Sequence, residues 1–242
     1  MASSDKKGVR NHFNDKQREE LMGRPLRMVP GDCVYHVLNR SNGRVSLFET
    51  DGDYAAFERV LAAACDRSTM RLLAYCVMPN HWHLVLWPRQ DGDLSRFMGW
   101  LTLTHTQRWH AHHRTVGHGH LYQGRFKSFV VEQSAALLTV CRYVERNALR
   151  AGLVERAEQW RWGSAWQRVG GASPVPLSAW PVDQPADWVM WVNTPQTDSE
   201  LIALRQSVTK GQPFGAPSWV EQMVRRWSLG STLRVRGRPK KA

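Results

Sequence analysis

The sequence predicts an α+β protein, in which an antiparallel sheet is covered by helices on one face and followed by a basic C-terminal extension. Hydrophobic residues make up 42% of the 242 residues, which is enough to build a packed core. Segments with the two-residue period of strands alternate along the chain with segments of helical spacing. The turn-forming Pro79-Asn80 separates two apolar segments, so these two strands should pair as an antiparallel hairpin.

The first predicted strand lies within residues 27–40, where His36 shares one face with Val34 and Leu38. A helix should follow to about residue 67, with Asp51 or Asp53 as its N-cap. The next elements are strands at 71–77 and 81–87, a helix at 94–112, a strand at 126–131, and a helix from Ser134 to about 151 that Gly152 closes.

After residue 160 the patterns weaken, and residues 170–200 receive no firm assignment. Two short helices are expected at 198–208 and 218–227, before a tail that is rich in Lys and Arg. The predicted organisation is a flexible arm (1–25), a catalytic domain (26–165), a helical or irregular extension (166–227) and a basic tail (228–242).

The net charge of +12 and the isoelectric point of about 10.1 predict a polyanionic partner, and nucleic acid is the commonest one. A membrane surface is the competing partner, but the sequence has neither a basic amphipathic helix nor a lipidation motif. No stretch approaches about 18 consecutive apolar residues, and the N-terminus lacks the apolar core of a signal peptide. We therefore expect a cytoplasmic protein without a membrane partner, whose four widely spaced cysteines are reduced.

The segment Met78–Leu84 carries the strongest functional signal. On a strand, residues two apart point the same way, so His81 and His83 should project together while Trp82 packs into the core. Two imidazoles side by side form half of a divalent-metal site. The alternative is a pair of surface or hydrogen-bonded histidines, because His-x-His also arises by chance.

A second candidate group lies on the predicted helix from Ser134. Tyr143 and Asn147 are one turn apart on one face, about 100° round the helix from its apolar stripe. This spacing places them at the rim of the core, where a side chain is held but can be reached. The alternative is a tyrosine that packs against the sheet beside a solvated amide. Tyr122, in the loop before the fourth strand, is the second candidate nucleophile.

Together these segments resemble the HUH family of DNA-nicking enzymes, and within it the REP-associated tyrosine transposases. The resemblance covers about residues 25–165 and extends to the C-terminal end. It rests on Tyr75–Leu84, Gly119–Ser128, Tyr143–Asn147 and Arg150–Val154, with Gly237–Lys240 in the tail. The string Met-Pro-Asn-His-x-His-Leu is much more specific than His-x-His alone.

The resemblance implies a ferredoxin-like, RRM-related domain that cuts single-stranded DNA beside a palindromic hairpin and forms a 5′-phosphotyrosine. It implies that Tyr143 is the nucleophile and that His81 and His83 hold a Mg²⁺ or Mn²⁺ ion. By position, Asn147 is the third metal ligand. The order of the motifs, and Asn rather than a second Tyr at this position, fit the single-tyrosine branch. The resemblance also favours a monomer with no small-molecule cofactor other than the metal.

The remaining candidates are side chains that suit contacts with DNA phosphates. Arg125 and Lys127 lie two apart on a predicted strand and so share one face. The alternative is that this face is only exposed to solvent and contacts no DNA. His120 belongs to a histidine-rich stretch whose spacing fits no standard zinc finger, and a solvated loop is its alternative. The expected DNA contacts are His120, Arg125, Lys127, Arg146, Arg150, Arg234, Arg236, Arg238, Lys240 and Lys241.

Two other functions fit part of this pattern. A replication initiator of the same chemistry would usually bring a helicase or primase domain, and the sequence contains no Walker motif. A non-catalytic nucleic-acid-binding protein with an RRM-like sheet would need neither the histidine pair nor Tyr143, and its binding would not depend on metal.

Overall fold

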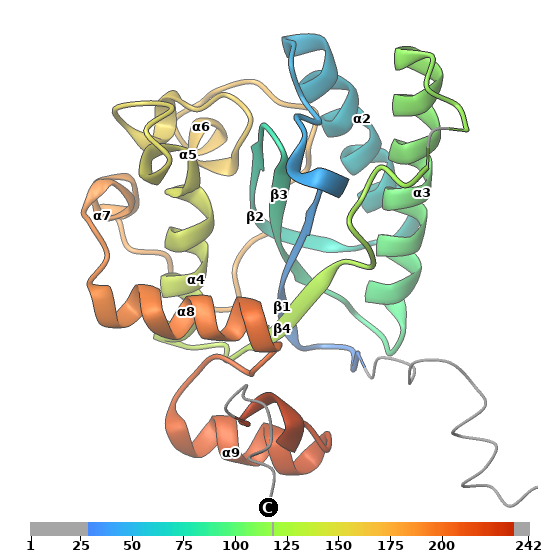
Figure 1. Ribbon diagram of the computed structural model, residues 1–242. Helices are drawn as coiled ribbons and strands as arrows, with labels where there is room; N and C mark the ends of the chain where they lie inside the picture. Colours follow the sequence, from blue (N-terminus) through green and yellow to red (C-terminus); the bar gives the residue numbers. More distant parts are fainter. Residues whose placement is uncertain (1–28, 118, 235–242) are drawn as a thin grey trace, which may run out of the picture.

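The computed structural model describes residues 29–117 and 119–234 (Figure 1). The expected N-terminal arm (1–25) and the part of the basic tail beyond Arg234 lie outside the described residues. The predicted α+β class is confirmed, because a four-stranded sheet forms the centre of the molecule and helices pack against it.

All four strands are antiparallel to their neighbours, in the order β2-β3-β1-β4. Their bounds are Val34–Arg40 (β1), Arg71–Met78 (β2), His81–Trp87 (β3) and Lys127–Val131 (β4). The β2–β3 hairpin turns where Pro79-Asn80 predicts it. In the centre of the sheet, Leu38 of β1 lies opposite His83 on one side and Lys127 on the other. β1 therefore brings the histidine strand and the basic start of β4 close together.

Helices α2 (Asp51–Ser68) and α3 (Asp93–His113) cover one face of the sheet. The N-cap of α2 is Thr50 rather than the aspartate that the sequence suggested. Its hydroxyl accepts from the Asp53 N–H and the Asp53 carboxylate accepts from the Thr50 N–H, which is a capping box. Trp82 is fully buried on this side of the sheet, as predicted.

The opposite face is also covered, which corrects the prediction of helices on one face only. Helix α4 (Ala135–Glu145) and the short α5 (Asn147–Arg150) lie on the side away from α2 and α3 (Figure 1). The physical reason lies in β2, which is buried along nearly its whole length. Such a strand is apolar on both faces, so the face of Leu73 and Cys76 needs cover as much as that of Tyr75.

The helix predicted from Ser134 is present, but it divides at Arg146 into α4 and α5. Ser134 is the N-cap, as predicted, and its hydroxyl accepts from the Ala136 N–H. At Arg146 the ψ angle is −2°, yet its N–H still donates to the Arg142 carbonyl and its carbonyl accepts from the Arg150 N–H. The helical hydrogen bonding is therefore continuous across the division.

The C-terminal extension packs against α4 and the outer edge of β4. Its described helices are α6 (Ser164–Arg168), α7 (Trp188–Asn193), α8 (Asp198–Lys210) and α9 (Pro217–Arg226). Single 3-10 turns occur at Asn42–Arg44, Ala157–Gln159 and Gly230–Thr232. The sequence predicted α8 and α9 but not α6 or α7. Among the described helices, none has the length and apolar character needed to cross a membrane.

Glu145 joins this extension to α4. Its carboxylate is buried and accepts hydrogen bonds from Ser164 at 2.6 Å, from Arg168 at 2.7 Å and from the Trp188 indole at 2.6 Å. A buried carboxylate is tolerated when a cation and further donors surround it. Residues from α6 and α7 therefore complete the environment of the last residue of α4.

Candidate active site

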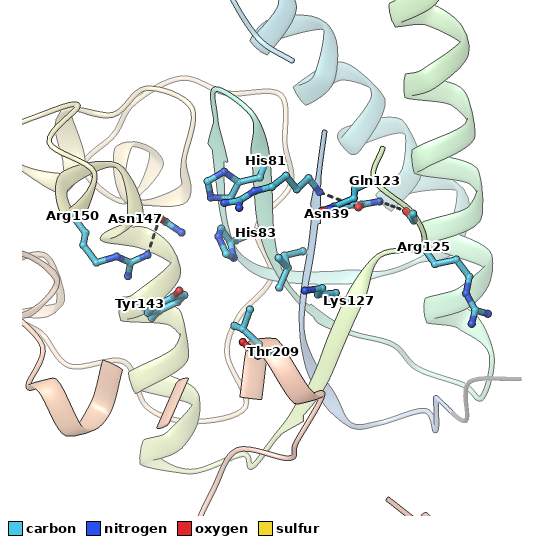
Figure 2. A pocket seen from close by; sticks show the side chains of 14 residues that line it. Asn39, His81, His83, Gln123, Arg125, Lys127, Tyr143, Asn147, Arg150 and Thr209 are labelled. Carbon is cyan, nitrogen blue, oxygen red and sulfur yellow. Dashed lines mark hydrogen bonds between the residues drawn. The ribbon is translucent and has the colours of Figure 1, made fainter. Parts of the chain in front are cut away.

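A cavity of about 650 Å³ lies between β1, the start of β3 and the α4–α5 segment (Figure 2). His81 and His83 reach it from β3, and Tyr143, Asn147 and Arg150 reach it from the opposite side. The structure thus brings the three residues predicted to hold metal and the predicted nucleophile to one cavity, although they are up to 66 positions apart in the sequence (147 − 81).

Each of the two histidines is held through its Nδ1 atom. Their ring centroids are 5.0 Å apart. The Nδ1 atom of His81 hydrogen-bonds with Asn80 Oδ1 at 2.7 Å, and Nδ1 of His83 hydrogen-bonds with Nε2 of His36 at 2.9 Å. In the described part of the chain no group bonds to the Nε2 atom of either histidine. Both Nε2 atoms can therefore bind a ligand in the cavity.

Burial keeps both histidines neutral. It lowers the pKa of His81 to about 4, and repulsion from Arg40 and Arg150 adds to the effect. Burial also holds the pKa of His83 well below its ordinary value, with smaller contributions from His36 and His81. A metal ligand needs the lone pair of a neutral imidazole. At neutral pH these side chains can accept a cation without first losing a proton.

Tyr143 faces the histidines from α4. Its ring meets that of His83 at 86°, with the centroids 5.9 Å apart, and Figure 2 shows its hydroxyl directed toward the cavity. The side chain is only 7% exposed, so it is buried more deeply than the rim position that helical spacing predicted. The guanidinium of Arg150 lies over the ring, 4.1 Å from its centre. These contacts fix the ring and leave the hydroxyl at the cavity.

Asn147 lies one turn beyond Tyr143. Its Oδ1 accepts a hydrogen bond from Arg150 Nη2 at 2.9 Å, while its Nδ2 is buried without a partner among the described residues. A buried donor without a partner costs about 1–3 kcal/mol. The donor chemistry of the two histidines fits a divalent cation. Asn147 fits less directly, because its oxygen already accepts a hydrogen bond from Arg150.

A comparison with known families finds a match for this domain. Residues 31–147 match the family model described as "Transposase IS200 like". The matched range contains the whole sheet and ends at Asn147, so it includes both histidines and Tyr143. Residues 31–147 are therefore similar to an IS200-like transposase domain. The cavity beside Tyr143 is the candidate active site.

Two solved structures are similar to this chain. One is described as a REP-associated tyrosine transposase bound to a REP hairpin; it is 17% identical with a TM-score of 0.49, and the match covers 65% of this chain and 93% of that one. The other, from Deinococcus radiodurans R1, is provisionally described as a transposase; it is 19% identical with a TM-score of 0.37, covering 52% of this chain and 95% of that one. No curated protein matches the chain.

Three of the residues predicted to contact DNA line the transposase cavity: Arg125, Lys127 and Arg150. Figure 2 shows Arg125 directed away from the two histidines. His120 lines a second cavity, of about 710 Å³, beside α3. The two cavities share Asn39 and the segment 123–125, so they meet at the loop before β4.

The other predicted DNA contacts lie elsewhere. Arg146 lines neither cavity, and its guanidinium donates to the carbonyl groups of Val192 and Asn193, which attaches α7 to the tyrosine helix. Arg234 is exposed at the end of the described residues. The remaining four, Arg236, Arg238, Lys240 and Lys241, lie outside the described residues.

Tyr122, the second candidate nucleophile, belongs to a buried network. Its hydroxyl accepts from the Trp82 indole at 3.0 Å and bonds with Nδ1 of His105 at 2.7 Å. Burial raises the pKa of this hydroxyl. These contacts suit a residue that anchors the loop before β4, whereas the Tyr143 hydroxyl faces the histidine pair.

Sequence analysis missed several residues that shape the cavity. Asn39 and Arg40, at the end of β1, line it, and His36 lies behind His83. Thr209, at the end of α8, closes another side, as Figure 2 shows. The alternation along β1 placed His36 on one face of its strand but did not indicate a role for it. Nothing in the sequence indicated that β1 lies beside β3 or that α8 reaches the cavity.

One other group of ligand-type side chains occurs among the described residues. The ligand atoms of Asp53, His112 and His113 all lie within 4.8 Å of one another. The group sits at the start of α2 and the end of α3, on the opposite face of the sheet from Tyr143. Because the Asp53 carboxylate already bonds with Thr50 and His113, the group is satisfied without an ion.

Proposed function

We propose that this transposase is a single-stranded DNA endonuclease and strand-transferase, which acts on hairpin-forming, REP-like repeat DNA through a covalent 5′-phosphotyrosine at Tyr143. One observation carries the proposal: the Tyr143 hydroxyl and the free Nε2 atoms of His81 and His83 share one cavity. The hairpin as substrate comes from the resemblance of the motifs. The cytoplasm is the proposed location.

In this proposal the Tyr143 oxygen attacks the phosphorus of one DNA phosphodiester. The bond from phosphorus to the 3′ oxygen breaks, the tyrosine proton passes to solvent, and the departing oxygen takes up a proton to become a free 3′-OH. The new phosphodiester between Tyr143 and the 5′ end keeps the energy of the broken bond. A 3′-OH can later attack it in the reverse sense, which joins strands without ATP.

Arg150 has two functions in this scheme. It lies over the Tyr143 ring, where its charge stabilises negative charge that develops on the phenol oxygen. It also lines the cavity together with Arg40 and Lys127, and these three cations suit a phosphate group. The chain thereby orients the nucleophile and attracts its target with the same guanidinium.

The proposed cofactor is a Mg²⁺ or Mn²⁺ ion held by His81 and His83, with Asn147 as the third ligand. When bound, such an ion polarises the scissile phosphate and stabilises its negative charge. Two imidazoles among the protein ligands favour Mn²⁺, because Mg²⁺ prefers an all-oxygen shell. Because His81, His83 and Tyr143 line one cavity of a single chain, a monomer is sufficient for this proposal.

A labelled hairpin oligonucleotide tests the proposal. The transposase is incubated with Mn²⁺ and a hairpin that has single-stranded flanks, and the products are separated on a denaturing gel. A label at the 3′ end should migrate with the protein, whereas a label at the 5′ end should leave on a shortened oligonucleotide. Tyr143→Phe should give no adduct, and Tyr122→Phe should still give one.

The same gel separates the rival functions. Hairpin binding without any adduct, unchanged by chelator, would favour a non-catalytic RRM-like protein. An adduct that forms with Tyr143→Phe would remove Tyr143 as the nucleophile. Nicking without rejoining, even when a 3′-OH strand is supplied in excess, would contradict the strand-transferase part of the proposal.

A further inference from the structure

The two proposed metal-binding histidines are supported by different kinds of partner. Asn80 holds His81 through its side-chain oxygen, and its Nδ2 donates to the Arg44 carbonyl at 3.3 Å, which fixes the orientation of the amide. An amide oxygen only accepts, so Nδ1 of His81 must carry the proton. The lone pair of His81 is then on Nε2, which faces the cavity.

His83 has no such one-way partner. Its Nδ1 meets Nε2 of His36 at 2.9 Å, and an imidazole nitrogen can either donate or accept. If His83 donates, its Nε2 has a free lone pair and can bind a cation. If His36 donates, the proton of His83 must sit on Nε2, where it repels a cation. The direction of this one hydrogen bond decides whether His83 can be a ligand.

Among the described residues, the side chain of His36 hydrogen-bonds only with His83. It is completely buried on β1, with its ring 4.8 Å from that of Phe129 and 6.2 Å from that of Tyr143, measured between centroids. Its other nitrogen, Nδ1, has no hydrogen-bond partner among the described residues. A buried polar atom without a partner is costly. A core position between aromatic rings would suit an apolar residue better unless the bond to His83 has a use.

We infer that His36 is a positioning residue, which accepts the Nδ1 proton of His83 and so presents the His83 Nε2 lone pair to the metal. This inference rests on the metal site of the proposed function. Because no described residue bonds to His36 Nδ1, the pair can shift its proton to suit the occupant of the cavity. Partners of this kind typically change metal affinity by about 10- to 100-fold when they are removed.

The test measures Mn²⁺ affinity by calorimetry rather than DNA cleavage, with three variants of the full chain. His36→Phe keeps a ring between Phe129 and His83 but removes the acceptor. His36→Gln replaces the ring nitrogen with an amide oxygen that can accept from His83. Phe129→Leu is the matched control, because it alters the packing around His36 without touching the hydrogen bond.

We expect His36→Phe to bind Mn²⁺ about 10- to 100-fold more weakly than the wild type, with His36→Gln restoring most of the affinity and Phe129→Leu changing it little. Equal affinities for His36→Phe and Phe129→Leu would overturn the role of His36. If His83→Ala binds Mn²⁺ as tightly as the wild type, both the proposed metal site and the proposed role of His36 are wrong. Loss in His83→Ala without loss in His36→Phe overturns only the latter.

A second measurement does not depend on how well the variants fold. Nitrogen NMR of the wild-type transposase with Mg²⁺ should find the proton of His83 on Nδ1 and that of His36 also on Nδ1. A proton on Nε2 of His36 would contradict the inference, because His36 would then be the donor.

Discussion

Arg150 covers the ring of Tyr143 at 4.1 Å and at the same time donates to the Asn147 side chain at 2.9 Å. One guanidinium therefore touches both the proposed nucleophile and the proposed third metal ligand. Of its other two nitrogens, Nη1 is buried without a partner among the described residues. The arrangement suggests that Arg150 matters more for chemistry than for folding, and the first prediction follows from it.

Replacing Arg150 with Gln should slow formation of the covalent adduct by roughly 2- to 30-fold, as expected for a cation–π contact of about 0.5–2 kcal/mol. Gln removes the charge but can still donate to Asn147. Lys should be intermediate, because a compact ammonium cannot cover the ring and reach the amide together. Single-turnover adduct rates measure the effect. An unchanged rate in Arg150→Gln would argue against a role for this charge.

The three proposed metal ligands should differ in importance. His81→Ala and His83→Ala should each abolish metal-dependent cleavage, and excess chelator should do the same to the wild type. Asn147→Ala should be milder, because its oxygen is engaged by Arg150 and water can replace an amide ligand. Cleavage assays over a Mn²⁺ titration compare the variants. Activity that persists in excess chelator would rule out the metal mechanism.

The substrate should be single-stranded DNA that carries a hairpin. A duplex holds each phosphodiester in a stiff, paired backbone, whereas an unpaired flank can bend to bring one phosphate to the buried Tyr143. We expect cleavage of the hairpin with single-stranded flanks and little cleavage of the same sequence annealed to its complement. Equal rates on both forms would contradict this expectation.

Acid should destabilise the transposase partly through His105. Burial lowers the pKa of His105 to about 3, opposed by attraction to Asp53 and aided by repulsion from His113. In the unfolded chain His105 has a pKa of about 6.5, so below this pH it binds a proton in the unfolded state but not in the folded state. The free energy of unfolding therefore falls by up to about 1.4 kcal/mol per pH unit, down to about pH 3. Between about pH 6 and about pH 4, the slope of the unfolding free energy against pH should be smaller in His105→Gln than in the wild type. The difference should correspond to roughly one bound proton.

The basic C-terminal tail should contribute affinity more than chemistry. Truncation after Trp227 removes five positive charges, at Arg234, Arg236, Arg238, Lys240 and Lys241. If all five neutralise phosphates, the slope of log affinity against log salt should flatten by about 4. An unchanged slope would indicate a tail that only aids solubility. Faster cleavage at unchanged affinity would instead indicate that the tail restrains the enzyme.

Local patterns predicted the elements that carry the chemistry. The alternation around Trp82 placed both histidines on one face, and the spacing on the Ser134 helix placed Tyr143 beside Asn147. Such signals depend on neighbours within a few residues, and the structure agrees with them. The burial of Tyr143 was underestimated, because helical spacing does not reveal that the extension and Arg150 also cover this side.

Long-range relationships could not be predicted in the same way. The pairing of Leu38 with His83 depends on the strand order, which no local pattern encodes. His36 looked like an ordinary strand residue until its neighbour across the sheet was known. Helix α7 was missed because its residues bury Trp188 and Val192 against α4, and this benefit exists only after the chain has folded.

The carboxylate of Glu145 has a consequence for how the molecule can be divided. The family match ends at Asn147, but Arg168 and Trp188, which satisfy Glu145, come later in the chain. Without the residues after Asn147, the Glu145 carboxylate would lose these partners, and the face of α4 that Trp188 and Val192 cover would be exposed to water. The matched range and the part of the chain that completes the surroundings of α4 therefore have different boundaries. A gene fragment that encodes only residues 31–147 would yield a chain whose tyrosine helix presents an apolar face to solvent.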